Sequence, residues 1–408
     1  MKVLFVHQNF PGQFRSLAPA LVARGDTVLA MGVNNFAGYP GIRYVQCRPD
    51  RNTMTDGHPW TKDFDSKVIR GHAAFRAALN LRNEGFDPDV IIAHPGWGEA
   101  LFLKSVWPEA RLGIYCEYFY SADGADMQFD AEFPSGSVEE NRSRLLVKNA
   151  ANLLQMPQAS AAIAPTRWQA DTFPEEFRDR ISVIHDGIDT SLVKPNPAAG
   201  IQLNKRVNLT RSDEVITFVN RNLEPYRGYH VFMRALPELL ARRPNAHVII
   251  IGGDDVSYGA APPAGHSWKN IFLREVSGRI DAQRVHFLGK VPYKDYLAVL
   301  CTSAVHVYLT YPFVLSWSLI ESMAMECAIV ASDTEPVREV LSDGEQGILV
   351  PFFDGRKLVD EVCGLLDNPE KRRSLGQAAR SRAIAEFDLR SVCLPQQLGW
   401  VDKLFAAD

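Results

Sequence analysis

Two arginines in the second half of the chain are spaced as residues that could bind a phosphorylated ligand. Arg221 follows an apolar strand, and Arg227 lies six residues further on, just before Gly228 and a helical segment. Two guanidinium groups in one strand-to-helix loop can both reach a diphosphate, because each donates paired hydrogen bonds to phosphate oxygens. The alternative is a pair of ordinary solvated loop arginines.

The stretch that begins at Tyr311 predicts a second contact to phosphate. Ser316 and Ser318 are good N-cap residues for the helix that follows. A helix N-terminus offers free N–H groups and a partial positive charge, so a phosphate can bind there. Glu321, about one turn later, could accept hydrogen bonds from sugar hydroxyls. It could equally close a capping box with Ser318 and only satisfy a backbone donor.

Three residues of the first half follow predicted strands and are candidates for contacts to a sugar. Gly12 lies in the loop after the first strand and could allow close backbone approach to a ligand, although a plain turn is the simpler interpretation. His94 begins a loop that also holds Trp97, and a buried histidine packed on the tryptophan is the alternative. Glu117 follows a third strand.

An acidic segment follows Glu117 and carries Asp123, Asp126 and Asp130. The spacing of these carboxylates does not match an EF-hand loop. We expect the segment to be solvated rather than to bind a metal.

Composition and charge limit the classes of function. The chain has 408 residues, of which 46% are hydrophobic and 23% charged, as in ordinary globular proteins. Its net charge of −4 argues against a nucleic-acid partner. The six cysteines form no metal or disulfide pattern, and the N-terminal apolar run is too short for a signal peptide, so a cytoplasmic protein is expected.

No apolar run approaches the roughly 20 residues of a membrane span. Peripheral attachment to the inner face of a membrane is compatible with the sequence. However, the basic cluster of Arg142, Arg144 and Lys148 is small and is more typical of a solvated surface. The oligomeric state cannot be read from the sequence.

Short apolar strands alternate with helical segments in both halves, which predicts parallel sheets covered on both faces. A proline-rich stretch at 193–200 separates the halves. We therefore expect two doubly wound, Rossmann-like α/β domains, with ligands bound at the carboxyl ends of the strands. A dinucleotide-dependent oxidoreductase would share this sheet, but no strand-to-helix turn carries G-x-G-x-x-G with an acidic residue about twenty positions later.

The second half resembles the family 4 glycosyltransferases over nearly its whole length. Arg221–Gly228 (RNLEPYRG) resembles the family's Arg-Leu-spacer-Lys-Gly signature, with arginine in place of lysine. Val285–Val291 (VHFLGKV) and the Glu321-Ser322-Met323-Ala324 helix also match, as do 183–190 (VIHDGIDT) and 338–350. All these segments occur in the family's order.

The resemblance implies a GT-B fold, in which two Rossmann-like domains face each other across a cleft and a C-terminal helix crosses back to the first domain. The implied limits are 1–195 for an acceptor-binding domain, 196–385 for a nucleotide-sugar-binding domain and 386–408 for the returning helix. It also implies that Arg221 and Arg227 bind the donor diphosphate and that Glu321 binds the ribose. Backbone groups near Lys290 and Val291 would contact the base, and Val314, Leu315 and Ser316 would donate N–H groups to the phosphates.

Besides the arginine at position 227, three positions depart from the family pattern. Phe313 stands eight positions before Glu321, where the family carries a glutamate that approaches the donor sugar. Glu117 stands where relatives commonly have a histidine near the reacting carbon, and the resemblance implies that a carboxylate there could orient an acceptor hydroxyl or stabilise positive charge on the sugar ring. Glu326 stands where a helix-ending glycine is common, so a left-handed backbone there would carry strain.

The expected function is transfer of a sugar, with retention, from a UDP- or GDP-linked donor to a hydroxyl of a glycan, a glycolipid or a small molecule. No cofactor or metal is expected, and polysaccharide, glycolipid or glycoconjugate biosynthesis is the expected context. A non-catalytic nucleotide-sugar or polysaccharide-binding relative is the alternative.

Overall fold

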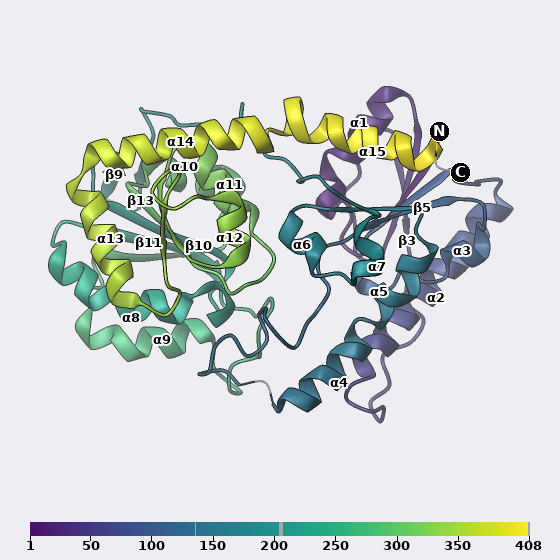
Figure 1. Cartoon of the computed structure of the whole chain (residues 1–408), viewed down its shortest axis with the longest axis horizontal. Helices are drawn as coiled ribbons and strands as arrows, with labels where there is room; N and C mark the ends of the chain where they lie inside the picture. The colour runs from purple at the N-terminus through teal and green to yellow at the C-terminus, as the bar shows by residue number, and fades with distance from the viewer. Residues whose placement is uncertain (135, 204–206, 407–408) are drawn as a thin grey trace. The chain divides into compact units, whose positions relative to one another are not determined.

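The computed structural model describes residues 1–134, 136–203 and 207–406. The chain forms two compact α/β units (Figure 1). Unit 1 is built from 1–123, 136–187 and the residues from 390 onward, whereas unit 2 is built from 124–134 and 188–389. The short segment 124–134 therefore belongs to unit 2, although the chain on both sides of it belongs to unit 1.

Unit 1 is built on a seven-stranded parallel sheet in which β1 and β4 are central neighbours. Side chains alternate between its two faces, so Leu4 and Val6 enter one core cluster while Val3 and Phe5 enter another. In spatial order the strands are β3 (Ile42–Gln46), β2 (Thr27–Gly32), β1 (Lys2–Val6), β4 (Val90–Ala93), β5 (Arg111–Tyr115), β6 (Ala161–Ala164) and β7 (Ile181–Val183).

Helices cover both faces of this sheet, as continuous apolar strands require. α1 and α15 pack with Phe5, and α2 and α3 pack with Leu4. The helices are α1 (Leu17–Arg24), α2 (Lys62–Asn83), α3 (Leu103–Val106), α4 (Val138–Lys148), α5 (Ala150–Gln155), α6 (Arg167–Asp171), α7 (Glu175–Arg178) and α15 (Leu394–Ala406).

Unit 2 repeats this plan with a six-stranded parallel sheet. In spatial order its strands are β12 (Val285–Gly289), β11 (His247–Gly253), β10 (Val215–Asn222), β13 (Val305–Tyr308), β14 (Ala328–Ser332) and β15 (Ile348–Val350). Two further short strands, β8 (Gly200–Gln202) and β9 (Asn208–Thr210), pair antiparallel.

The helices of unit 2 lie in two layers, with α8, α9 and α13 packed together and α11 packed on α14. They are α8 (Tyr229–Arg242), α9 (Trp268–Val276), α10 (Tyr293–Thr302), α11 (Trp317–Ala324), α12 (Glu335–Val340), α13 (Gly355–Asp367) and α14 (Pro369–Phe387). Among the described residues, no helix is both long and apolar enough to cross a bilayer.

The C-terminal helix α15 packs on unit 1, as expected for the crossing helix. After α14 ends at Phe387, a π-helical turn over Leu389–Cys393 leads into α15. Its Trp400, Val401 and Leu404 are buried in the core cluster that contains Phe5. The expected architecture, two Rossmann-like domains with a returning C-terminal helix, is confirmed.

Glu326 adopts the left-handed backbone expected from its position, with φ of 56° just after α11. We expect Glu326→Gly to raise the free energy of unfolding by about 0.5–1 kcal/mol, because glycine has no Cβ to strain this conformation. Urea denaturation measures the change. The control is Gly376→Ala, whose new Cβ would lie 2.4 Å from the Glu326 carbonyl oxygen and should destabilise the protein. A loss of stability in Glu326→Gly would contradict the prediction.

Candidate active site

The two arginines predicted to bind phosphate, near the connection between β10 and α8, differ in their exposure to solvent. Arg221 lies at the end of β10 and is exposed, whereas Arg227 is only 4% exposed. The Arg227 Nη1 donates to Thr310 Oγ1 over 2.7 Å. Gly228 follows with φ of +66°, and a Cβ there would lie 2.3 Å from Leu309, so glycine is required for the tight entry into α8. Arg227 is therefore held within the unit, whereas Arg221 lies on the surface.

Aromatic rings surround the Arg227 guanidinium. Its centre lies 4.9 Å from the Tyr258 ring and 5.9 Å from the Phe313 ring. Phe313 also packs edge-on against Tyr226 at 5.5 Å, and its ring is tilted against Tyr258 at 5.1 Å. The position at which the family carries a sugar-binding glutamate is thus part of an aromatic wall beside Arg227.

Glu224, to which the sequence analysis assigned no role, holds the loop that carries Tyr258. Its carboxylate is fully buried and accepts hydrogen bonds from the backbone N–H groups of Ser257, Tyr258 and Gly259 at 3.2–3.3 Å. A buried carboxylate needs such donors to offset its desolvation. One feature of the sequence could have indicated a role for Glu224, because it lies between the two predicted phosphate-binding residues, Arg221 and Arg227.

The structure at the start of α11 excludes the alternative in which Glu321 closes a capping box with Ser318. The N-cap is Ser316, whose hydroxyl accepts from the Ser318 N–H at 3.3 Å. The third helical residue is therefore Leu319, and Glu321 lies too far along α11 to close the cap. Its carboxylate instead accepts hydrogen bonds from the hydroxyls of Tyr293 and Tyr296, each at 2.7 Å.

The other predicted nucleotide contacts lie at the same end of the sheet in unit 2. The Ser316 N–H donates to the Tyr308 hydroxyl at 3.0 Å, so it would reach a phosphate only by leaving this partner. Val314 and Leu315 are half-buried beside it. Lys290 follows β12 and pairs with Asp255 at 2.7 Å on the surface, and Val291 packs on the core. Arg221 lies at the end of β10, and the other predicted residues follow strands β10, β12 and β13, whose carboxyl ends form the ligand-binding edge of such sheets.

In unit 1, His94 and Glu117 are brought together at the ends of β4 and β5. His94 Nε2 lies 3.2 Å from Glu117 Oε2, and the Gly96 N–H donates to His94 Nδ1. Because Nδ1 accepts, the ring proton is on Nε2, which donates to the carboxylate. His94 is 3% exposed and stacks on Trp97 with 4.4 Å between the ring centres. This agrees with the alternative interpretation, a buried histidine packed on the tryptophan, but His94 also contacts Glu117.

His7 and Gln13 extend this cluster, and His7 was missed by the sequence analysis. The Asn9 N–H donates to His7 Nδ1, so His7 Nε2 donates to Gln13 Oε1 at 2.8 Å. The Gln13 amide in turn donates to Glu117 Oε1 at 3.1 Å. Burial, and the neighbouring His94, lower the pKa of His7 to about 3, which keeps its imidazole neutral. Glu117 therefore receives a hydrogen bond on each carboxylate oxygen.

Gly12 supports the same cluster rather than an open loop. Its φ is +47°, and a Cβ at this position would lie 2.3 Å from His7 Nε2. Any larger residue would displace the imidazole from Gln13. The structure thus brings Gly12, His94 and Glu117 together in unit 1. In unit 2, Arg227 follows β10, and Ser316 and Glu321 follow β13, at the carboxyl edge of the sheet.

The acidic segment is not solvated as expected, because two of its three aspartates are buried in unit 2. Asp126 accepts from the Tyr226 hydroxyl at 2.7 Å, and Asp130 accepts from the Tyr311 hydroxyl at 2.7 Å. Only Asp123 is exposed, in a surface pair with Arg142. The buried partners are aromatic hydroxyls distant in sequence, which local spacing could not reveal.

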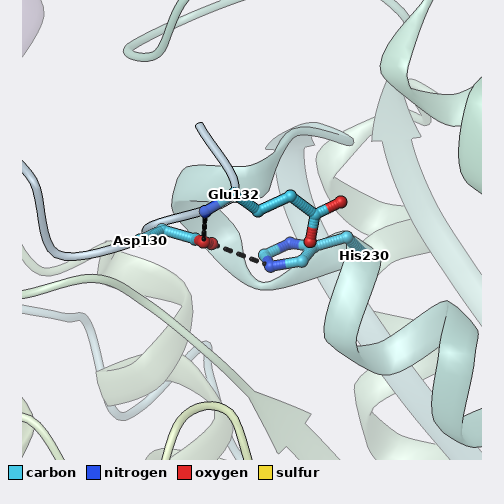
Figure 2. Close-up of side chains that lie close together, drawn as sticks. All are labelled: Asp130, Glu132 and His230. Atoms are coloured by element: carbon cyan, nitrogen blue, oxygen red, sulfur yellow. Dashed lines mark hydrogen bonds and ion pairs between the residues drawn. The ribbon is translucent and has the colours of Figure 1, made fainter. Parts of the chain in front are cut away.

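Asp130 also contacts His230 and the backbone of Glu132, as Figure 2 shows. His230 Nε2 lies 3.0 Å from Asp130 Oδ2, and the Glu132 N–H donates to Asp130 Oδ1 at 2.9 Å. Ligand atoms of these three residues lie within 4.8 Å of one another, a spacing that could suit a cation. However, both Glu132 carboxylate oxygens bind Arg234 at 2.6 and 2.7 Å. The cluster is better explained as a clamp that holds 124–134 on unit 2.

We expect Asp130→Asn to lower the free energy of unfolding by about 1–3 kcal/mol at pH 7. Burial raises the pKa of Asp130, but hydrogen bonds from His230, Tyr311 and the Glu132 N–H outweigh it and bring the pKa below its usual range. A lowered folded pKa stabilises the protein above the unfolded value near 4, and this contribution is lost as pH falls through the folded pKa.

Urea denaturation of both proteins between pH 7 and pH 3 tests this prediction. The difference in the free energy of unfolding between the parent protein and Asp130→Asn should shrink as the pH drops below about 4. Asp123→Asn, at an exposed pair, is the matched control and should change stability by less than about 0.5 kcal/mol. A difference that is independent of pH would contradict the assigned role of the carboxylate charge.

Family models and curated relatives show which proteins this chain is similar to. A family model described as glycosyl transferase family 4 group matches residues 24–193, and one described as glycosyl transferases group 1 matches 201–382. Among relatives, the D-inositol 3-phosphate glycosyltransferase of Corynebacterium efficiens is 26% identical over 74% of this chain and 68% of its own. The phosphatidyl-myo-inositol mannosyltransferase of Mycolicibacterium smegmatis is 32% identical over 54% and 51%, respectively.

Solved structures share the fold over the whole chain. The sucrose-phosphate synthase from Thermosynechococcus elongatus superposes with a TM-score of 0.75 at 17% identity, and each chain is covered completely. Anabaena HepE in complex with UDP-glucose gives a TM-score of 0.71 at 16% identity, with 99% of this chain and 100% of the other covered.

Two parallel-sheet domains and a returning helix give the chain the GT-B fold. The chain belongs to family 4 of the glycosyltransferases. The expected enzyme class is confirmed.

Proposed function

We propose that the chain transfers a hexosyl group from a UDP- or GDP-linked sugar to an acceptor hydroxyl, with retention at the anomeric carbon. The observation that carries the proposal is the placing of Arg227, the α11 start and Glu321 at the carboxyl edge of the unit 2 sheet. Arg227, assisted by the exposed Arg221, stabilises the charge that develops on the leaving diphosphate. Glu321 binds the ribose. Catalysis is then electrostatic and needs no metal.

The acceptor side of the proposal is the Glu117 cluster of unit 1. With a hydrogen bond donated to each oxygen, the Glu117 carboxylate is held in place as a negatively charged acceptor, and this carboxylate orients the acceptor hydroxyl. The named relatives act on inositol phosphate and phosphatidylinositol, so a polyol or a glycolipid head group is the acceptor class that we propose. Action at the cytoplasmic face of a membrane stays a prediction.

Release of the nucleoside diphosphate tests the proposal. UDP- and GDP-linked hexoses are incubated with the protein, with and without inositol phosphates or polyols, and UDP or GDP is measured. We expect release to rise with an acceptor for one donor. The same nucleotide should raise the Tm, because a ligand at 100 times its Kd stabilises by about 2.7 kcal/mol. Binding without release, for any donor and acceptor pair, would favour the binding-protein alternative.

A further inference from the structure

The carboxylate proposed to bind the ribose is already occupied by two hydroxyls of the chain itself. Tyr293 donates to Glu321 Oε1 and Tyr296 donates to Glu321 Oε2, both at 2.7 Å. The two tyrosines lie at the start of α10, three residues apart and therefore on one helix face. Glu321 is 5% exposed, so it needs donors to offset its desolvation.

The two hydroxyls differ in how readily a ligand could replace them. Tyr296 is 8% exposed and belongs to the core cluster of unit 2, whereas Tyr293 is 45% exposed. Burial, and next the Glu321 charge, raise the pKa of Tyr296 well above its usual value, so it stays a neutral donor. Oε2 is thus held from the core by Tyr296, and Oε1 is held from the exposed side by Tyr293.

We propose that Tyr293 occupies the place of a ribose hydroxyl at Glu321 and that a bound nucleotide displaces it. This inference rests on the proposed function of Glu321. The exchange is balanced, because a ribose O–H takes over the hydrogen bond that the Tyr293 O–H gives up, while Tyr296 stays on Oε2. Tyr293 keeps the carboxylate satisfied without ligand, and it competes with the ribose hydroxyl for Oε1.

The proposal predicts opposite effects of two similar substitutions. Tyr293→Phe keeps the ring and removes the competing hydroxyl, so UDP or GDP should bind roughly three- to tenfold more tightly. Tyr296→Phe leaves a buried carboxylate oxygen without its donor and should lower the Tm without tightening either nucleotide. Isothermal titration calorimetry with UDP and GDP measures both effects.

A nucleotide without ribose hydroxyls isolates the exchange. We expect 2′,3′-dideoxy-UDP, or the GDP equivalent where GDP is preferred, to gain less from Tyr293→Phe than the natural nucleotide does, since it has no hydroxyl to place on Oε1. Unchanged or weaker binding of the natural nucleotide to Tyr293→Phe would overturn the proposal. An equal gain for both nucleotides would overturn it too.

Glu321→Gln separates this inference from the proposed function. If Glu321→Gln weakens binding of the natural nucleotide but Tyr293→Phe has no effect, Glu321 binds ribose and the role of Tyr293 is wrong. If Glu321→Gln binds UDP and GDP as the parent protein does, the ribose assignment itself fails and the inference falls with it.

Discussion

Replacing Arg227 with alanine is expected to lower kcat about 100- to 1,000-fold, as removal of a preorganised donor to a developing charge does in other enzymes. The guanidinium is fixed by Thr310 on one side and by the Tyr258 and Phe313 rings on the others. Such a group needs little reorganisation when charge develops on the leaving diphosphate. The measurement is steady-state release of the nucleoside diphosphate from the preferred donor.

Stability must be measured with the rate, because Arg227 is buried. Its loss removes the partner of Thr310 and opens a cavity, so the unfolding free energy should fall by about 2 kcal/mol. Assays therefore run well below the Tm of the variant. Arg227→Lys keeps the charge and most of the stem, and should recover part of the rate. Arg221→Ala removes an exposed arginine and should lower the rate less than Arg227→Ala. A normal rate in Arg227→Ala would remove Arg227 from the proposed mechanism.

The regular elements of the core could be predicted from the sequence because they are set by local patterns. α8 spans Tyr229–Arg242 and begins directly after Gly228, where the sequence analysis expected a helical segment, and the central strands follow continuous apolar runs. The edge strand β3 was not anticipated, since its residues are mostly half-buried and its pattern is weak. The 3₁₀ turn over Gly12–Arg15, which precedes the first helix at Leu17, was not anticipated either.

The residue types of the candidate site could be predicted, but their partners could not. Tyr293 and Tyr296 meet Glu321 across more than twenty residues of sequence, and Asp130 meets Tyr311 across 181. No local spacing encodes such contacts. The family resemblance located the ligand-binding edge and gave no information on how the free protein satisfies its buried charges.

His7 is a different case, because a sequence signal was present. It directly follows β1 as His94 directly follows β4, and Val6 pairs with Ala93 in the parallel sheet. Parallel neighbours end at the same edge, so the two histidines had to lie close together; their rings are 5.3 Å apart. What could not be foreseen was Gln13, which joins His7 to Glu117.

Replacing Glu117 with glutamine is expected to lower kcat roughly 100-fold, the lower end of the range for a positioned acid or base. Both oxygens of Glu117 accept hydrogen bonds, from His94 and Gln13. A glutamine offers one acceptor and one donor, so its amide must oppose one of these donors and the cluster must rearrange. The acceptor hydroxyl then loses the carboxylate that orients it. Kinetics with varied acceptor concentration measure kcat and KM separately.

Glu109→Gln is the matched control, since Glu109 is an exposed glutamate of the same unit and should leave the rate unchanged. Gln13→Leu provides a second variant, because it removes one donor and keeps the Glu117 charge, and its loss of rate should be smaller than that of Glu117→Gln. The pH profile adds a check: His7, with its pKa lowered to about 3, stays neutral and should contribute no inflection between pH 5 and 8. If Glu117→Gln changes only the KM for the acceptor, Glu117 binds the acceptor without acting on the transition state.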